Sequence, residues 1–307
     1  MVVVHTQMKI LVATDLHPAA DEAIRQAHAW SSERDEFAVI HVLPNLQPLV
    51  PLFPQENQAH LFDVATISDR AEIAVRNRVS DLTGRPVDRF EVFIDQGIDY
   101  AEIARRASSW KADLVVVGTH GASALEHLLV GSVTERVARY CSCPVLVTRP
   151  PTEKANGPVI AATDLSDPSL PAIVAGHKEA ERRHAELVVV HAIDFVISPP
   201  VSSGVFFGLV PTTYSPEAIK EMENIAGAEL TGALKRLNVE GQTRVVAGDA
   251  DEVIVLEAQE RHAQLVVVGT HGRTGLAHIA LGSVAEHVMR AAPCSVLVVR
   301  LASTKQL

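Results

Sequence analysis

Two kinds of hydrophobic pattern alternate along the first half of the chain. Short continuous apolar runs, typical of strands buried on both faces, are separated by longer stretches in which apolar residues recur every three or four positions. The short runs predict strands at Lys9–Ala13, Phe37–Leu43, Val87–Asp95, Leu114–Val117 and Val145–Thr148.

The longer stretches predict amphipathic helices between these strands. They run from about Pro18 to Ser32, up to about Gly84, from about Ile98 to Lys111 and from about Ser132 onward. Two apolar stripes support the last two helices: Ile103, Ala107 and Trp110, then Val133, Val137 and Tyr140. Strands that alternate with helices predict a parallel sheet covered on both faces, with ligands beyond the carboxyl ends of its strands.

The second half of the chain repeats the first. Ala112–Gly121 reads ADLVVVGTHG and Ala263–Gly272 reads AQLVVVGTHG, and the offset stays near 150 residues throughout. So long a period indicates a duplicated domain rather than a solenoid. The sequence therefore predicts two tandem doubly wound parallel-sheet domains, at residues 1–150 and 157–307, joined by the polar, proline-containing segment Arg149–Pro158.

Composition narrows the classes of partner. Hydrophobic residues make up 47% of the chain, as in globular proteins, and the formal net charge of −10 disfavours nucleic acid or an anionic membrane as partner. Three cysteines do not form a disulfide framework, so we expect a reducing, cytoplasmic location. We expect neither a signal peptide nor a membrane span, because no sufficiently long apolar run occurs.

One glycine motif follows the fourth strand of each copy. Gly118 and Gly121 are followed, after nine residues, by Gly131-Ser132; Gly269 and Gly272 are followed in the same way by Gly282-Ser283. Glycines let a backbone approach an anion closely, and the amides of a helix N-terminus bind phosphate. Ser132-Val-Thr-Glu135 and Ser283-Val-Ala-Glu286 are also capping-box sequences, so the alternative is that the glycines only make turns and the serines only cap helices.

A second candidate element ends the first strand of each copy. It reads Ala13-Thr14-Asp15 in the first copy and Ala162-Thr163-Asp164 in the second. An Asp at this edge can accept hydrogen bonds from a base or a ribose, or it can cap the next helix. Beside the glycine loops, we favour the ligand role.

These motifs resemble the universal stress protein family, in its tandem, ATP-binding form, over nearly the whole chain. The resemblance implies an adenine nucleotide alpha hydrolase-like fold and ATP, with or without Mg²⁺, in each copy. In the first copy it implies a site of Ala13, Thr14, Asp15, Val42, Val117, Gly118, His120, Gly121, Gly131, Ser132 and Val133. In the second it implies Ala162, Thr163, Asp164, Ala192, Val268, Gly269, His271, Gly272, Arg273, Gly282, Ser283 and Val284.

The two implied sites differ in detail. Arg273 could add charge in the second copy, whereas the first copy has Ala122 at that position, and Ala192 replaces Val42 in the base pocket. The resemblance also implies that the copies pack about a pseudo-two-fold axis through Val145–Thr148 and Val296–Val299, and that two chains can associate as a homodimer.

Several alternatives stay open at this stage. Neither a G-x-x-x-x-G-K-[ST] loop nor an arginine finger can be placed, so we expect a regulator or sensor with slow or no hydrolysis rather than an enzyme, a slow ATPase or a nucleotidyl transferase being the alternative. The loops could instead serve a nucleotide-free interaction protein with unknown protein partners. The segments Leu46–Pro54 and Ile197–Pro211 could hold an apolar ligand or form a lid.

Single histidines and cysteines carry weaker hypotheses. His120 and His271 stand without a second ligand at zinc spacing, so we predict no metal site there. Cys143 and Cys294 occupy equivalent positions and are predicted to be core residues. Cys141 forms a C-x-C pair with Cys143 that could be redox-active, but only the first copy has it.

Overall fold

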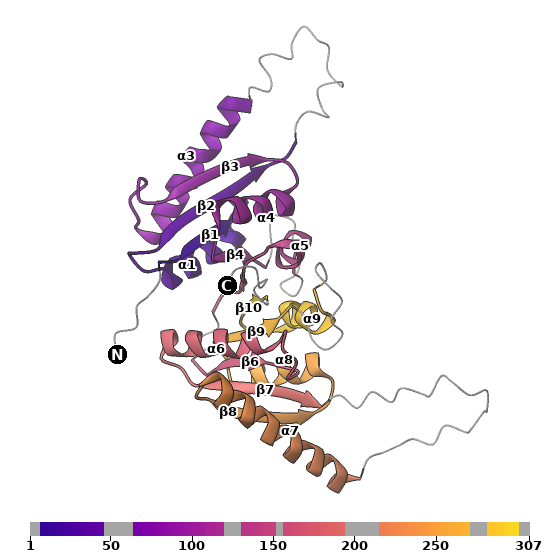
Figure 1. Cartoon of the computed structure of the whole chain (residues 1–307). Coiled ribbons are helices and arrows are strands. Elements are labelled where there is room, and N and C mark those ends of the chain that lie inside the picture. The colour runs from indigo at the N-terminus through magenta and orange to yellow at the C-terminus, as the bar shows by residue number, and fades with distance from the viewer. Residues whose placement is uncertain are drawn as a thin grey trace, which may run out of the picture.

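The chain folds into two copies of one α/β unit that share a single sheet (Figure 1). The structure is a computed structural model and describes residues 7–45, 64–119, 130–151, 156–193, 215–270 and 281–300. The first copy contains β1 (Lys9–Ala13), a 3-10 helix (Pro18–Ala20), α1 (Asp21–Trp30), β2 (Glu36–Leu43), α3 (Val64–Thr83), β3 (Glu91–Gln96), α4 (Asp99–Trp110), β4 (Leu114–Gly118), α5 (Ser132–Tyr140) and β5 (Val145–Thr148).

The second copy repeats this order. It contains β6 (Val159–Ala162), α6 (Leu170–Arg183), β7 (Leu187–Ile193), α7 (Pro216–Leu237), β8 (Gln242–Ala247), α8 (Ala250–Glu260), β9 (Leu265–Gly269), α9 (Ser283–Ala291) and β10 (Ser295–Val299). The strand order β3-β2-β1-β4-β5 and its counterpart β8-β7-β6-β9-β10 reverse direction between β1 and β4, and between β6 and β9. The predicted doubly wound, parallel architecture is therefore confirmed, and a ligand is expected at this point of reversal.

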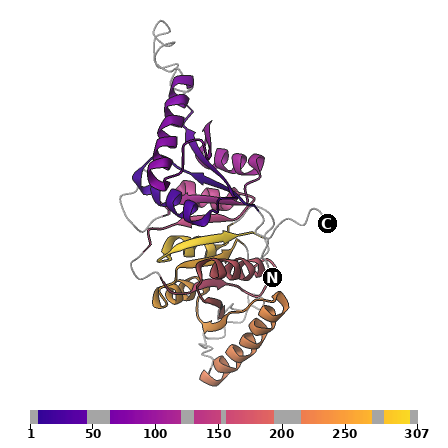
Figure 2. The same cartoon turned by 90° about the vertical axis from the view of Figure 1, so that its left-hand side faces the viewer.

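The two copies meet through their last strands. β5 and β10 pair antiparallel, with Val296 opposite Val147, Leu297 opposite Leu146 and Val298 opposite Val145. This pairing confirms the predicted interface and leaves α3 and α7 at opposite outer ends of the molecule (Figure 2). All the other strand pairs are parallel.

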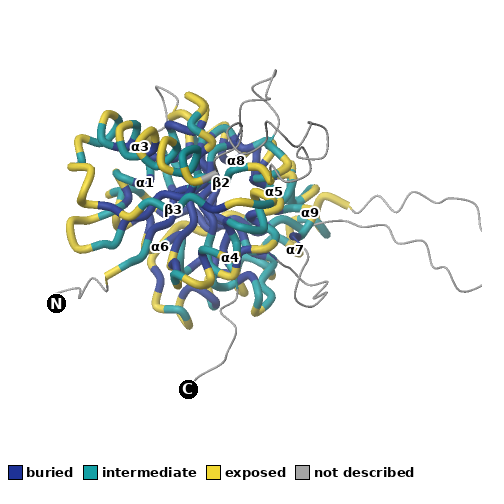
Figure 3. The backbone as a smooth tube through the Cα atoms, turned by 90° about the horizontal axis from the view of Figure 1, so that it is seen from above, coloured by how far each residue is buried: buried dark blue, intermediate teal, exposed yellow. Residues whose placement is uncertain are grey.

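Helices cover both faces of the shared sheet, so the core has two layers (Figure 3). One layer packs α4, α5, α8 and α9 against the strands, and the other packs α1, α3, α6 and α7. Successive residues of each strand enter different layers, as the alternation of side chains along a strand requires. Because each layer contains residues of both copies, the two units are joined by buried apolar contacts as well as by strand pairing.

The local predictions hold with four corrections. The segment predicted as one helix from Pro18 begins as a 3-10 turn, and the α-helix starts at Asp21. The third strand starts at Glu91 instead of Val87, whose side chain is exposed. Tyr140 does not share the buried face of its helix: it is 47% exposed and lies 5.4 Å from the Tyr100 ring.

The fourth correction concerns the end of the first helix. We predicted that it runs to about Ser32, but α1 ends at Trp30 and Ser31 is its extended C-cap. The end of the next helix is as predicted, because α3 stops at Thr83 and Gly84 has φ +69°. Glycine adopts this conformation without the steric cost that other residues carry.

Candidate functional site

A cavity of about 180 Å³ opens where the strand order of the first copy reverses. Its lining contains nine residues implied by the sequence: Ala13, Thr14, Asp15, Val42, Val117, Gly118, Gly131, Ser132 and Val133. They come from the carboxyl ends of β1, β2 and β4 and from the start of α5. The fold thus brings together residues that are up to about 120 positions apart in the sequence.

Sequence reasoning missed five residues of this lining. They are Ala20, Ile40, Asp99, Ile103 and Thr134. Ile40 precedes Val42 on the same face of β2, so period-two alternation would have found it. Asp99 follows Gly97, which has φ +152°, and the equivalent Gly248 has φ +147°. Comparing these two glycines in the aligned copies would have pointed to the turn that places Asp99.

The turn after β1 has a fixed conformation. The Leu16 amide donates to Thr14 Oγ1 at 3.1 Å, and the His17 amide donates to Asp15 Oδ1 at 2.9 Å. Leu16 itself has φ +64°, a region that costs a branched residue roughly 1–2 kcal/mol. His41 Nδ1 lies 2.9 Å from the Thr14 carbonyl oxygen and secures the turn from the neighbouring strand.

The second copy holds the same turn by the same contacts. Leu165 also has φ +64°, and His191 Nδ1 lies 2.9 Å from the Thr163 carbonyl oxygen. Asp164 Oδ1 accepts hydrogen bonds from the amide and the hydroxyl of Ser166, at 3.0 and 2.5 Å. The end of the first strand is therefore held in the same conformation in both copies.

The helix that follows each glycine loop has a glycine at its N-cap. Gly131 precedes α5 with φ −64° and ψ 148°, Gly282 precedes α9 with φ −66° and ψ 149°, and neither helix start receives a side-chain cap. The predicted capping boxes are therefore wrong: Ser132 and Ser283 are the first helical residues, one position too late to cap. The first-turn amides are left for another acceptor.

Among the described residues, nothing around either glycine excludes a small side chain. Both have negative φ, and within this described part of the chain a Cβ on Gly131 would meet only the Thr119 carbonyl oxygen, at an ordinary 3.4 Å. A Cβ on Gly282 would lie 3.2 Å from the Thr270 oxygen, which asks for a small adjustment. Ser, Thr, Asp or Asn would stabilise an N-cap better.

The remaining implied residues of the second copy lie in equivalent places. Ala162 and Ala192 lie at the ends of β6 and β7, Val268 and Gly269 end β9, and Ser283 and Val284 begin α9. His120, Gly121, His271, Gly272 and Arg273 lie outside the described residues, as do Ala122 and the whole of both segments proposed as a lid.

The cysteines do not form a reactive pair. Burial raises the pKa of the Cys141 and Cys294 thiols to about 12 and that of the Cys143 thiol to about 11. All three are free cysteines, and Cys294 is a core residue as predicted, while Cys143 is half-buried. Thiols that stay protonated at neutral pH are poor nucleophiles, which disfavours the redox hypothesis.

Two searches cover only the described part of the chain. Within it, no group of three or more His, Cys, Asp or Glu side chains is arranged to hold a metal ion. Within the same residues, no helix has both the length and the apolar character needed to cross a membrane.

Comparisons with known proteins agree with this architecture. The sequence profile of the universal stress protein family matches residues 7–149 and again residues 156–300. A universal stress protein of Mycolicibacterium smegmatis is 30% identical over 314 residues, which cover 96% of this chain and 98% of that protein. Universal stress protein Rv2623 of Mycobacterium tuberculosis is 29% identical over 313 residues, covering 96% and 97%.

A solved structure shows the same fold. The universal stress protein of Archaeoglobus fulgidus superposes with a TM-score of 0.62 at 20% identity, covering 95% of this chain and 98% of that one. The duplicated profile match, the full-length relatives and the repeated site geometry lead to one conclusion. This chain belongs to the universal stress protein family, as a member with two tandem family domains.

Proposed function

We propose that each copy binds an adenine nucleotide, ATP in particular, at the carboxyl ends of its strands, giving two sites per chain. The observation that carries this proposal is the uncapped glycine at the start of α5 and of α9. In the first copy this glycine borders the 180 Å³ cavity. A helix start that lacks a side-chain cap, beside a cavity, fits a phosphate group.

The lining of the first cavity suits a nucleotide from end to end. Ile40, Val42 and Val117 offer an apolar wall for a base, and the Asp15 carboxylate can accept a hydrogen bond from an amino or hydroxyl group. The amides of Ser132 and Val133 face the phosphates. The cavity is smaller than the roughly 300–1,000 Å³ of pockets for drug-sized ligands, so part of the nucleotide lies across its mouth.

Any Mg²⁺ bound with the nucleotide would take most of its ligands from phosphates and water, as this ion usually does. The cavity lining supplies two carboxylates, Asp15 and Asp99, among the described residues. Fast phosphoryl transfer also needs groups that position a water and stabilise the transition state. We therefore propose slow or no hydrolysis, with steady-state turnover below about one per second, under the usual enzyme range.

In this proposal, occupancy rather than turnover is the output: the protein acts as a cytoplasmic regulator or sensor in a stress response, and bound nucleotide alters its conformation or its choice of partner. The association of two chains stays a prediction from the family resemblance.

The test compares nucleotide binding with helix capping. Purified protein is denatured and the released nucleotide identified by chromatography, and stripped protein is titrated with ATP in a calorimeter. We expect about two equivalents per chain, one for each copy. The double variant Gly131→Ser/Gly282→Ser places a capping hydroxyl at both helix starts.

If the glycines serve the ligand, the double variant gains a few tenths of a kcal/mol in the free energy of unfolding without nucleotide and loses ATP affinity at least about tenfold. If the glycines are only structural, stability rises and every binding measurement stays as in the parent protein. Absence of nucleotide, titration heat and thermal shift in the parent protein would instead support the interaction-protein hypothesis.

A further inference from the structure

A second cavity lies between the two copies and shares no described lining residue with the first. It measures about 390 Å³ and is bordered by α1 of the first copy and α6 of the second. These helices cover the sheet face opposite α5 and α9. Since its walls come from both copies, this interdomain groove exists only in the tandem arrangement.

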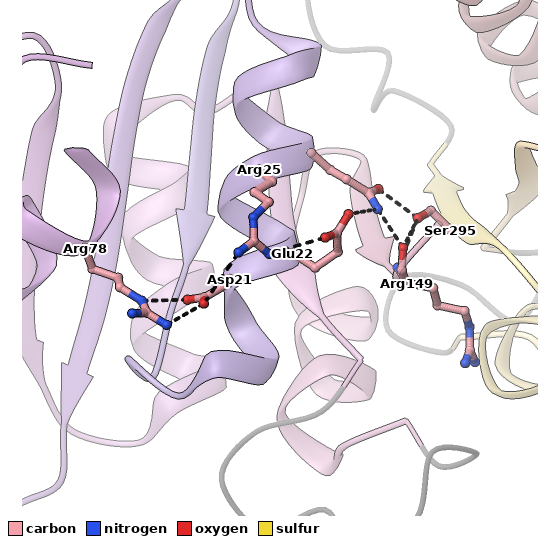
Figure 4. A network of polar contacts seen from close by, with 7 residues as sticks. Asp21, Glu22, Arg25, Arg78, Arg149 and Ser295 are labelled. Atoms are coloured by element: carbon pink, nitrogen blue, oxygen red, sulfur yellow. Dashed lines mark hydrogen bonds and ion pairs between the residues drawn. The ribbon is translucent and has the colours of Figure 1, made fainter. Parts of the chain in front are cut away.

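A polar network fixes the floor of the interdomain groove (Figure 4). Gln26 Nε2 donates to the Arg149 carbonyl oxygen at 2.6 Å and to Glu22 Oε1 at 2.7 Å. The Ser295 hydroxyl donates to Gln26 Oε1 at 2.8 Å and accepts from the Arg149 amide at 3.0 Å. These bonds join α1, β5 and β10, so the groove has a set shape.

The wall of the groove is cationic although the chain carries a net charge of −10. Its described lining includes Arg25, Arg149, Arg182 and Arg183 and a single carboxylate, Glu22. Arg25 is held only loosely, at 3.7 Å from Glu22 and 3.9 Å from Asp21, and its side chain is 51% exposed. It is therefore available to an incoming anion.

Among the described residues, the two deeper arginines make no short hydrogen bond to a carboxylate. Burial lowers the pKa of both Arg149 and Arg183. Arg149 donates to the carbonyl oxygens of Met289 and Arg290 instead of to a carboxylate. Arg183 Nε lies 3.7 Å from Glu179 Oε2, which is too long for a hydrogen bond.

Three buried N–H donors of this wall have no hydrogen-bond partner in the part of the chain that the structure describes: Trp30 Nε1, Arg149 Nε and Arg183 Nε. The Trp30 side chain is only 8% exposed, and the Arg182 and Arg183 guanidinium groups lie 5.1 and 5.3 Å from its ring. Glu179 Oε2, which lies 3.7 Å from Arg183 Nε, also lacks a hydrogen bond within the described residues, and the Arg149 guanidinium donates to the end of α9. Buried polar groups are normally hydrogen-bonded, so Trp30 Nε1, beside two guanidinium groups, is the donor of this wall that most directly lacks an acceptor.

We propose that the interdomain groove binds a small anion that carries phosphate or carboxylate groups. Arginine forks are suited to both groups because they form two parallel hydrogen bonds with either. Phosphate and carboxylate present the same acceptor oxygens, and the experiment distinguishes between them.

Trp30 provides a reporter inside the groove. The chain has two tryptophans, so Trp110→Phe leaves Trp30 as the only one. In this background, inorganic phosphate and citrate are titrated separately at constant ionic strength, with chloride as the reference salt. We expect a saturable change in Trp30 fluorescence, and the anion that saturates at the lower concentration identifies the preferred group.

Arg25→Met should weaken this response about tenfold, as the loss of a charge-assisted contact does. Arg105→Met is the matched control, because Arg105 is similarly exposed (54%) but lies on α4, away from the groove. Arg183→Met should weaken the response as well, and Arg25→Met, at an exposed position, keeps the test valid if that variant folds poorly.

Three results would overturn the proposal: no saturable change with either anion, the same change with chloride alone, or equal effects of Arg25→Met and Arg105→Met. The Gly131→Ser/Gly282→Ser variant should leave the response intact. Loss of the response in that variant would place the anion at the nucleotide sites and would also count against the groove.

Discussion

The two copies agree at one end of their sites and differ at the other. Both begin the phosphate-side helix with an uncapped glycine in nearly the same backbone conformation, Gly131 and Gly282. At the opposite end, the equivalent positions carry different side chains. Val42 of the first copy corresponds to Ala192 of the second, and Asp99, which lines the first cavity, corresponds to Ala250.

This difference follows from the kind of group that does the binding. A phosphate is held by backbone amides, which the fold positions in any sequence that keeps the glycine and the helix start. A base or a ribose is recognised by side chains, which can change without disturbing the fold. We therefore expect the two sites to share their affinity for phosphates and to differ in their selectivity for the nucleoside.

The ion pair between a helix and the outermost strand of the sheet also differs between the copies. In the first copy the helix carries the cation, Arg106 on α4, and the strand carries the anion, Asp95 on β3. In the second copy the helix carries the anion, Glu257 on α8, and the strand carries the cation, Arg244 on β8, at 2.8 Å. Arg106 and Glu257 are equivalent positions, but the strand partners are not, because Asp95 corresponds to Val246 and Arg244 to Phe93. Each copy therefore builds its helix–strand ion pair from a different strand position and with the opposite polarity.

The largest effect is expected at the interface between the two copies. It tests whether the arginines on the two sides of this interface contribute equally to stability. Arg149 donates to the last carbonyls of α9, and Arg300 donates to the Ala138 and Arg139 carbonyls at the end of α5. Replacing either arginine by Met removes charge-assisted bonds and should lower the free energy of unfolding by about 2–3 kcal/mol. Denaturant unfolding measures both variants.

The control for this pair is Arg236→Met, an exposed position near the end of α7, which should change stability by less than about 0.5 kcal/mol. A large loss for only one of the two buried arginines would show that the interface is not symmetric.

The second prediction contrasts two buried glutamates, each placed between two arginines. Glu257 accepts hydrogen bonds from Arg244 and Arg261 at 2.8 and 2.7 Å; burial raises its pKa, but these bonds outweigh burial and the net shift is downward. Glu179 has arginine nitrogens only at 3.7–3.8 Å, so burial prevails and raises its pKa.

The two shifts give opposite pH dependences. The stabilisation by Glu257 is present above the ordinary pKa of 4.5 and is lost as the pH falls through its lowered folded-state pKa. Glu257→Gln should therefore cost about 1–2 kcal/mol at pH 7 and progressively less in acid. The contribution of Glu179 is full below pH 4.5 and is lost as the pH rises through its raised pKa.

Glu179→Gln should consequently become more favourable relative to the parent protein as the pH rises from 4.5. Urea unfolding at a series of pH values measures both curves. Parallel curves for the two variants would contradict the geometric distinction between hydrogen-bonded and merely neighbouring arginines.

The third prediction applies the serine substitutions one copy at a time. Gly131→Ser and Gly282→Ser should each weaken one site about tenfold, because the hydroxyl competes for the same amides, and should leave the other site intact. Calorimetric titration with ATP resolves a strong and a weakened site in each variant. Equal weakening of both sites by either substitution would mean that the copies do not bind independently.

Much of this arrangement could be predicted from the sequence. The repeat, the strand runs and the glycine spacing are local signals, and they led correctly to the architecture. The interface through Val145–Thr148 was implied by the family resemblance and is confirmed by the pairing of β5 with β10. The residues that line the first cavity could be predicted where they lie at the ends of strands, as Thr14 and Val117 do.

The missed features depend on spatial contacts. The interdomain groove arises because β5 and β10 pair and bring α1 beside α6, and no spacing within one copy reveals it. The capping-box interpretation of Ser132 was wrong because such a sequence does not fix where the helix begins. Here Gly131 is the N-cap, and its amide donates to the Thr119 carbonyl oxygen at 2.7 Å.

The smallest effect is expected at the part of each site that would contact the nucleoside, where the two copies carry different side chains. Asp99 lies on the rim of the first cavity, where its carboxylate can accept a hydrogen bond from a ribose hydroxyl; Ala250 offers no such group. Asp99→Ala should reduce the preference of the first site for ATP over 2′-deoxy- and 3′-deoxy-ATP by about fivefold, since an exposed hydrogen bond contributes about 1 kcal/mol. Ala250→Asp should introduce a comparable preference at the second site.

Competition titrations in the Gly282→Ser and Gly131→Ser backgrounds, respectively, isolate each site. If the Asp99 carboxylate only stabilises the start of α4, both deoxynucleotides will lose affinity in parallel with ATP, and the divergence between the copies will lie in helix stability instead of recognition.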